Sequence, residues 1–591
     1  MVVESPIAIE TDVAVPMRDG VVLRADVYRP AEAGPLPVLL TRTPYGKAAM
    51  PLTVESNRAL AEQGYIVVAQ DVRGRFASAG EFRVNHDDIA DGYDSVLWCA
   101  ALAGSTGDVG MFGISYMGIT QLLAAAQRPA PLKAIFPIQC RASQYERVFY
   151  DGAFHLGDRL SWSLMQALDT ATRQGVDAPE LRRFGALLFE RMAALAAGDQ
   201  EQLRRLQTEM LAMLEPWLRH LPLADLPVLQ GIAPHYFELL ERPTYDEAWH
   251  DLEVTRWFSE MDLPCASVGS WYDLHLIGNL NLYTGLRARA RTPRARQAQR
   301  LLVGPWTHGQ FVTRAGEVDF GPEATIDLVG MQARWFDHWL KGIDTGLLDE
   351  PPVRLFVMGA NRWRDEQEWP LARTVYVPYY FHSAGSANTL HGDGVLDPER
   401  PGDEPVDTYV YDPHDPVPTV GGKTLGLGAA PGPWDQRAIE ARPDVLCYTT
   451  TPLATDLEVT GPLAVTLYAA SSAPDTDWTA RLVDVHPDGR ALIVQEGIVR
   501  ASSRVPGAVP SPIRPGAVYE YRIDLWATSL LFLTGHRLRV EISSSNFPHW
   551  DRNLNTGLSG ISSSAVAAAH QTVFHDAARA SHILLPVIPP A

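Results

Sequence analysis

Apolar and polar positions along the first 144 residues follow an alternating strand and helix pattern. Residues 7–28 predict a β-hairpin, because alternating apolar positions flank the turn Arg18-Asp19-Gly20. Short apolar runs predict buried strands, and stretches of helical periodicity separate them. Strands that alternate with helices indicate βαβ units and a parallel sheet. The predicted elements that follow the hairpin are strands at 37–42, 64–70 and 132–137 and helices at 52–63 and 87–103.

The pattern changes twice further along the chain. Between about 145 and 245, apolar residues recur at helical spacing and predict a helical insertion that could cover an active site. Strand-like runs return at 264–269 and 300–305, followed by an amphipathic helix over 328–341. From residue 351 onward, short alternating strands between turns rich in Gly, Pro and Asp predict a β-sandwich or jelly roll.

These patterns together predict an α/β fold. We expect an α/β-hydrolase domain formed by residues 1–144 and 246–350, with a helical insertion at 145–245. Residues 351–591 are expected to form a C-terminal β jelly roll. Several domains suit a chain of 591 residues, because single hydrophobic cores stop growing near ~250–300 residues.

Composition excludes some classes of function. The net charge of −20 argues against nucleic acid and anionic membranes as partners, and suits neutral or cationic small molecules. Neither a signal peptide nor a run of ~18 apolar residues is found, so a cytoplasmic protein without a membrane span is expected. The four cysteines are widely spaced, which predicts no metal site and no disulfide framework. The sequence is compatible with a homodimer.

The stretch Val109–Ile119 resembles the turn that presents a catalytic serine. An apolar run ends at Ser115, between Gly113 and Gly118, and helix-forming residues follow at once. A strand, a sharp turn and a helix in this order expose a serine hydroxyl above a parallel sheet. The second glycine comes one position later than in the usual G-x-S-x-G pattern. Taken alone, the stretch is equally compatible with a tight turn in which the serine caps a helix.

Two further residues complete a catalytic triad. A serine hydroxyl needs a base within hydrogen-bond reach, and the base needs an acceptor that holds its tautomer. Asp273 and His308 each follow an apolar strand, in the order Ser, Asp, His that α/β-hydrolases use. Both residues lie at the carboxyl ends of predicted strands, where open α/β sheets place their sites. The sequence therefore predicts acyl transfer by Ser115, Asp273 and His308, with activity rising as the pH passes the histidine pKa, ~6.5 when unperturbed.

Several motifs resemble the family of bacterial cocaine esterase, which is related to X-Pro dipeptidyl peptidases and α-amino-acid ester hydrolases. In that family a tyrosine follows the nucleophile and the second glycine comes late, as Tyr116 and Gly118 do here. The resemblance implies a serine carboxylesterase without cofactor or metal, whose oxyanion hole consists of the Tyr45 hydroxyl and the Tyr116 backbone N–H. The motifs lie at 71–82, 85–88, 113–118, 271–273, 304–308, 353–359, 412–418 and 543–548.

The resemblance also implies a substrate pocket for small-molecule esters. His275 replaces an aromatic residue of the family and Gly426 replaces a bulky ring, so we expect a larger acyl pocket with a weaker hold on benzoyl groups. His275 could instead bind a polar acyl substituent. The residues implied to bind substrate are Phe149, Trp162, Trp271, His275, Leu425 and Gly426.

Two other functions compete with the esterase. One is an X-Pro dipeptidyl peptidase or amidase of the same family, which would need carboxylates for a substrate ammonium group. Leu274 and His275 follow Asp273, and no acidic cluster stands there. The other is a non-catalytic binding protein built on the jelly roll, which the ordered triad disfavours.

Overall fold

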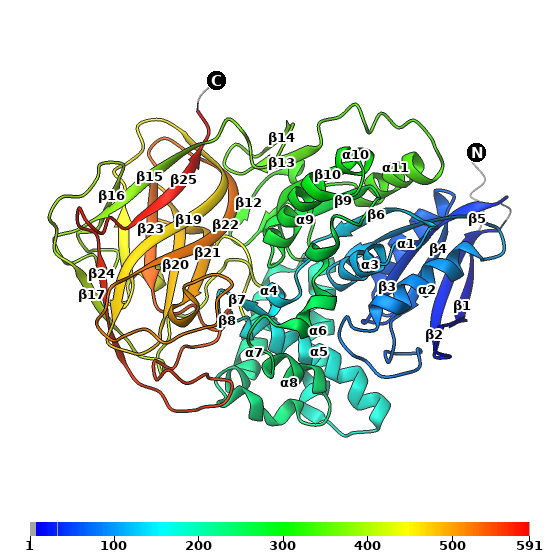
Figure 1. Ribbon diagram of the computed structural model, residues 1–591, viewed down its shortest axis with the longest axis horizontal. Coiled ribbons are helices and arrows are strands. Elements are labelled where there is room, and N and C mark those ends of the chain that lie inside the picture. Colours follow the sequence, from blue (N-terminus) through cyan, green and yellow to red (C-terminus); the bar gives the residue numbers. More distant parts are fainter. Residues whose placement is uncertain (1–6, 32–33, 590–591) are drawn as a thin grey trace.

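The computed structural model describes residues 7–31 and 34–589, and Figure 1 shows how they are arranged. In this part of the chain, ten strands form one sheet in the order β1-β2-β4-β3-β5-β6-β9-β10-β13-β14. The central strands from β4 to β13 run parallel, whereas β1, β2 and β14 pair antiparallel at the edges. The strands are β1 (Ile7–Pro16), β2 (Val22–Pro30), β3 (Leu36–Thr43), β4 (Ile66–Asp71), β5 (Ser105–Ile114), β6 (Leu132–Ile138), β9 (Cys265–Tyr272), β10 (Gln299–Thr307), β13 (Val353–Val357) and β14 (Arg362–Glu366).

Helices cover both faces of this sheet, which explains the nearly continuous apolar runs of its strands. In β3, Val38 and Leu40 belong to one buried cluster and Leu39 belongs to another. The first cluster includes side chains from α2 (Asp88–Ala100), α3 (Tyr116–Ala126) and α9 (Leu276–Arg289). The second includes side chains from α1 (Pro51–Glu62) and α11 (Leu328–Leu340). This doubly covered parallel sheet confirms the predicted α/β-hydrolase fold class.

A helical segment follows β6 and precedes β9 in the sequence, and it lies below the sheet in Figure 1. Its long helices are α5 (Leu156–Gln174), α6 (Pro179–Ala197) and α7 (Gln200–Leu218), and α8 (Pro234–Leu240) follows. Apolar residues at helical spacing, among them Leu160, Phe184 and Leu206, form the core of this segment. None of the described helices is long and apolar enough to cross a membrane.

The C-terminal part is a second, sheet-rich body, coloured yellow to red in Figure 1. Within the described residues, eleven strands form its sheet. The predicted border at residues 350/351 is wrong, because β13 and β14 belong to the first sheet: β13 pairs with β10 and β14 pairs with β13. Alternation predicts a strand but does not say which sheet it joins. The strands of the second sheet are β15 (Val375–His382), β16 (Val395–Asp397), β17 (Asp407–Tyr411), β18 (Leu446–Thr449), β19 (Leu457–Ser471), β20 (Asp477–Val485), β21 (Ala491–Arg500), β22 (Tyr519–Phe532), β23 (Arg537–Ser543), β24 (Ala569–Phe574) and β25 (His582–Val587).

Candidate active site

Ser115 lies at the sharp turn between β5 and α3 with strained backbone angles, φ 60° and ψ −120°. Both flanking glycines are required by close packing. A Cβ on Gly113 would come within 2.5 Å of Met117 Cβ, and one on Gly118 within 2.8 Å of Cys140 Cβ. The late glycine therefore lets α3 pack against the segment after β6. Strain of this kind persists where the surrounding structure holds it, and it turns the serine side chain outward.

Asp273 and His308 come together at the ends of neighbouring parallel strands, β9 and β10. His308 Nδ1 lies 2.6 Å from Asp273 Oδ2, and the His275 backbone N–H donates to Asp273 Oδ1 at 2.6 Å. Asp273 is fully buried, and each of its carboxylate oxygens makes one of these two contacts. With its proton on Nδ1, the imidazole of His308 keeps Nε2 free to act as a base.

Ser115 and His308 line one cavity, but no hydrogen bond joins their side chains in the described structure. Catalytic hydrogen bonds often tighten only when substrate binds, so this separation is compatible with a working pair.

Gln139, which the sequence analysis did not single out, fixes the loop that carries His308. Its amide nitrogen donates to the Thr307 carbonyl at 3.0 Å, and its amide oxygen accepts from the Gly309 N–H at 2.7 Å. Gln139 directly follows β6, is fully buried and has a positive φ of 43°. Nothing in the local sequence distinguishes it, because its partners lie about 170 residues away in the chain.

Of the two expected oxyanion donors, Tyr116 directly follows Ser115 and Tyr45 lines the same cavity. Tyr116 occupies the first position of α3, where a backbone N–H has no partner inside the helix. The hydroxyl of Tyr45 accepts a hydrogen bond from Trp162 Nε1 at 3.0 Å, so its own proton remains available to a substrate oxygen. Tyr45 lines the same cavity as Ser115 and is only partly buried.

The side chain of Tyr116 has a separate, structural role. Its hydroxyl donates to Asp88 Oδ2 at 2.5 Å and accepts from the Asn85 backbone N–H at 3.1 Å. Asp88 in turn pairs with buried Arg42 at 2.9 Å. The motif at residues 85–88 therefore anchors the start of α3, and with it the turn that holds Ser115.

A large cavity of about 2410 Å³ opens onto Ser115 and His308. Its wall combines the hydrolase sheet, the helical segment and the C-terminal part. Of the residues expected to bind substrate, Trp162, His275 and Leu425 line this cavity.

Three other residues expected to bind substrate lie off the cavity wall. Trp271 is fully buried and its indole donates to the Phe356 carbonyl at 2.8 Å. Its side chain therefore does not reach the site, although Asp273, two positions later, does. Phe149 is buried against aromatic residues of the helical segment. Gly426 faces Arg191, whose guanidinium lies 3.0 Å from the position of a Cβ. Trp271 and Phe149 are thus buried away from the cavity, whereas Gly426 lies beside Arg191, which lines the cavity, so its substrate-binding role stays a prediction.

His275 lies next to the catalytic imidazole, with ring centroids of His275 and His308 5.4 Å apart. Burial, His308 and nearby arginines together hold the pKa of His275 well below its usual range. Its Nδ1 has no hydrogen-bond partner among the described residues. His275 is therefore a neutral polar group on the cavity wall.

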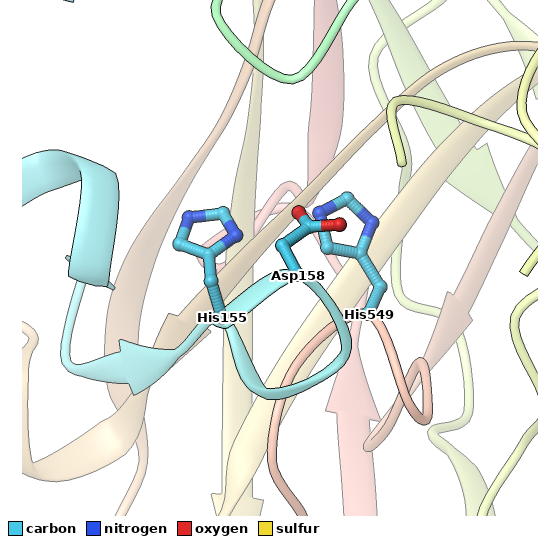
Figure 2. A group of neighbouring side chains, drawn as sticks. All are labelled: His155, Asp158 and His549. Carbon is cyan, nitrogen blue, oxygen red and sulfur yellow. The ribbon is translucent and has the colours of Figure 1, made fainter. Parts of the chain in front are cut away.

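Two groups of side chains in the described structure have the spacing of metal ligands. In His155, Asp158 and His549 the candidate ligand atoms all lie within 4.8 Å of one another, and Figure 2 shows this group. Burial and the charges of neighbouring Arg141 and Arg159 hold the pKa of His155 well below its usual range. These positive charges disfavour a cation at the first group. The second group, in the C-terminal part, consists of Asp484, His486 and His536.

Comparison with known proteins agrees with this geometry. Residues 19–310 match the X-Pro dipeptidyl-peptidase (S15) family, and residues 345–584 match the C-terminal non-catalytic domain of X-Pro dipeptidyl-peptidases. The chain is 39% identical to cocaine esterase from Rhodococcus sp. (strain MB1 Bresler), over 99% of this chain and 100% of that protein.

Two solved structures are similar over the same span. An aminopeptidase from a marine sediment archaeon, Thaumarchaeota archaeon, has a TM-score of 0.78 at 26% identity, with 99% of this chain and 97% of that chain covered. An α-amino acid ester hydrolase has a TM-score of 0.76 at 25% identity, with the same coverage. These similarities support the predicted serine ester hydrolase. The chain therefore belongs to the family of bacterial cocaine esterase, a family of α/β-hydrolases.

Proposed function

We propose that Ser115, Asp273 and His308 hydrolyse small-molecule carboxylic esters through an acyl-enzyme. His308 Nε2 takes the Ser115 hydroxyl proton while the serine oxygen attacks the ester carbonyl. The Tyr45 hydroxyl and the Tyr116 N–H donate hydrogen bonds to the resulting oxyanion. His308 then protonates the leaving alcohol, and a water activated by the same imidazole hydrolyses the acyl-enzyme.

One observation carries this proposal. The buried Asp273 carboxylate holds His308 Nδ1 at 2.6 Å, at the edge of a cavity that the strained Ser115 also lines. A histidine oriented by a buried carboxylate, next to a serine on a strained turn, is the arrangement that activates a hydroxyl for acyl transfer.

Hydrolysis of 4-nitrophenyl acetate and butyrate tests the proposal. We expect wild-type turnover to fall by at least about 10³-fold in Ser115→Ala, because the nucleophile is lost. Ser163→Ala is a matched control, since Ser163 is a buried serine of α5 that does not line the cavity. Equal rates in wild type and Ser115→Ala would exclude the serine mechanism.

The family description makes a dipeptidyl peptidase the second candidate. That activity needs carboxylates for a substrate ammonium group. In the described structure, the carboxylates on the cavity wall are Asp169 and Glu317. Asp169 already lies 3.5 Å from Arg75 Nε. We therefore favour the ester, and faster cleavage of glycyl-prolyl 4-nitroanilide than of 4-nitrophenyl butyrate would reverse this choice.

The name of the Rhodococcus relative makes cocaine-like benzoyl esters candidate substrates. We propose that acyl groups other than benzoyl are also accepted, since His275 gives the cavity a polar wall. A cytoplasmic enzyme and a homodimer are both compatible with the acidic composition.

A further inference from the structure

Arg147 and Arg159 bring two positive charges to the wall of the catalytic cavity. Their guanidinium carbons lie 5.2 and 6.0 Å from the ring centre of Trp162. The same indole donates to the Tyr45 hydroxyl at 3.0 Å. Both guanidinium groups therefore lie near the same indole that binds Tyr45, the expected oxyanion donor. This placement could not be predicted from the sequence, because arginines within a helical pattern usually face solvent.

Neither arginine has an anionic partner within the described residues. No carboxylate oxygen lies within 4.0 Å of either guanidinium, and Arg159 makes no hydrogen bond there. Arg147 Nη1 has only long contacts to two amide oxygens, at 3.4 Å to Asn85 and 3.3 Å to Gln144. The Nε atoms of both arginines are buried without a partner.

The nearest acidic neighbour in sequence, Asp158, is directed elsewhere. Its Oδ1 accepts from the Leu425 backbone N–H at 2.9 Å. Its carboxylate faces His155 and His549, as Figure 2 shows. Asp158 is therefore not an ion-pair partner for Arg159.

Leaving these charges unpaired is costly. Arg147 and Arg159 are only 6% and 3% exposed, and burial lowers the pKa of both guanidinium groups. Arg159 also lies in the first turn of α5, where the helix dipole repels a cation. Other buried arginines have carboxylate or carbonyl partners: Arg42 pairs with Asp88 at 2.9 Å, Arg539 pairs with Glu440 at 2.6 Å, and Arg141 donates to the Leu274 carbonyl at 3.1 Å. An unpaired pair of charges that faces a cavity is typical of a site that a ligand completes.

We propose that Arg159 and Arg147 bind a carboxylate carried by the substrate, so that the enzyme prefers esters with a second, free carboxylate. Guanidinium groups suit this task because they donate parallel hydrogen bonds to both oxygens of a carboxylate. This inference rests on the proposed ester hydrolysis and specifies its substrate class. It also reverses the expectation, drawn from net charge, of neutral or cationic substrates.

Matched pairs of esters test the inference. 4-Nitrophenyl 4-carboxybenzoate and 4-nitrophenyl 4-carbamoylbenzoate have the same shape and differ in the charge of the acyl group. The acetate esters of 4-hydroxybenzoate and 4-hydroxybenzamide make the same comparison in the leaving group. We expect the anionic member of at least one pair to have the higher kcat/KM, and the pair that responds identifies the side of the ester that the arginines contact.

Variants then connect this ratio to the arginines. Arg159→Met and Arg147→Met should each lower the anionic-to-neutral ratio of kcat/KM about 10- to 150-fold, the usual effect of a hydrogen bond to a charged group. Arg159→Lys should give an intermediate ratio, because lysine keeps the positive charge but cannot donate two parallel hydrogen bonds to a carboxylate. The control is Arg183→Met, since Arg183 does not line the cavity, is 65% exposed and already pairs with Glu209 at 3.3 Å. It should leave the ratio unchanged.

The outcomes separate this inference from the proposed function. Hydrolysis that depends on Ser115 but shows the same ratio in wild type and in both arginine variants would overturn the carboxylate site and leave the esterase intact. Calorimetric binding of terephthalate needs no turnover. Loss of that binding in Arg159→Met but not in Arg183→Met supports the carboxylate site even if no ester is hydrolysed, and equal binding in all three proteins overturns it.

Discussion

Tyr45→Phe removes a single hydroxyl and tests the oxyanion hole directly. This hydroxyl has one observed partner and one proposed partner. It accepts the Trp162 indole N–H at 3.0 Å, and its proton remains free for the substrate oxygen. The variant therefore loses one donor to the oxyanion and leaves a buried indole N–H without a partner.

The two losses have different sizes and different readouts. Removing one oxyanion donor typically lowers kcat by about 10²–10³-fold, or about 2.7–4 kcal/mol. The unpartnered indole costs about 1–3 kcal/mol of stability, because Trp162 is 3% exposed. Since the first interaction forms only in the transition state, we expect kcat and kcat/KM to fall equally and KM to stay within about 2-fold.

Steady-state hydrolysis of 4-nitrophenyl butyrate, together with thermal unfolding, measures both effects. Trp162→Phe keeps the phenol and removes its indole partner, so it should lower kcat only about 3- to 10-fold. Tyr283→Phe is the matched control: its hydroxyl is buried without a partner and lies off the cavity wall. A kcat for Tyr45→Phe within about 3-fold of wild type would refute the role of this hydroxyl in the oxyanion hole.

Two further predictions concern positioning and pH. Gln139→Ala removes the hydrogen bonds that hold the Thr307–Gly309 loop, so kcat should fall about 10-fold with little change in KM, and a normal kcat would contradict this. Burial and the Asp524 carboxylate raise the pKa of Asp151 from 3.8 to about 7, so the folded state binds this proton more tightly and the contribution of Asp151 to stability declines as the pH rises from about 4 to 7. Asp151→Asn should remove this decline and gain about 1–3 kcal/mol at pH 8 but not at pH 4, as thermal unfolding at both pH values will show. A gain of equal size at both values would exclude this cause.

The proposed triad could be located from the sequence because strand ends in a parallel sheet meet at one edge. Apolar runs located β5, β9 and β10, and each of the three triad residues directly follows one of them. Gly118, one position late in the pattern, is explained only by the approach of α3 to Cys140.

Contacts between residues far apart in the chain could not be predicted in the same way. Trp271 lies two positions before Asp273, and only the structure shows that its indole points away from the cavity toward Phe356. The hydrogen-bond partners of Gln139, and the lack of a partner for Arg159 among the described residues, both depend on residues far away in the chain. Neither feature therefore has a signal in the local sequence. Alternation in residues 353–357 predicted a strand correctly and assigned it to the wrong sheet.

Catalysis and substrate choice are linked through α5. This helix supplies Trp162, which holds the Tyr45 hydroxyl, and Arg159, which we assign to the substrate carboxylate. Its first turn is fixed from the C-terminal part of the chain: Gly157 N–H donates to the Pro548 carbonyl at 2.7 Å, and a Cβ on Gly157 would come within 2.8 Å of that oxygen. The C-terminal part therefore does more than cover the cavity. By setting where α5 begins, it positions the partner of the proposed oxyanion donor together with the proposed specificity residue, so a change at this contact should alter both kcat and substrate preference.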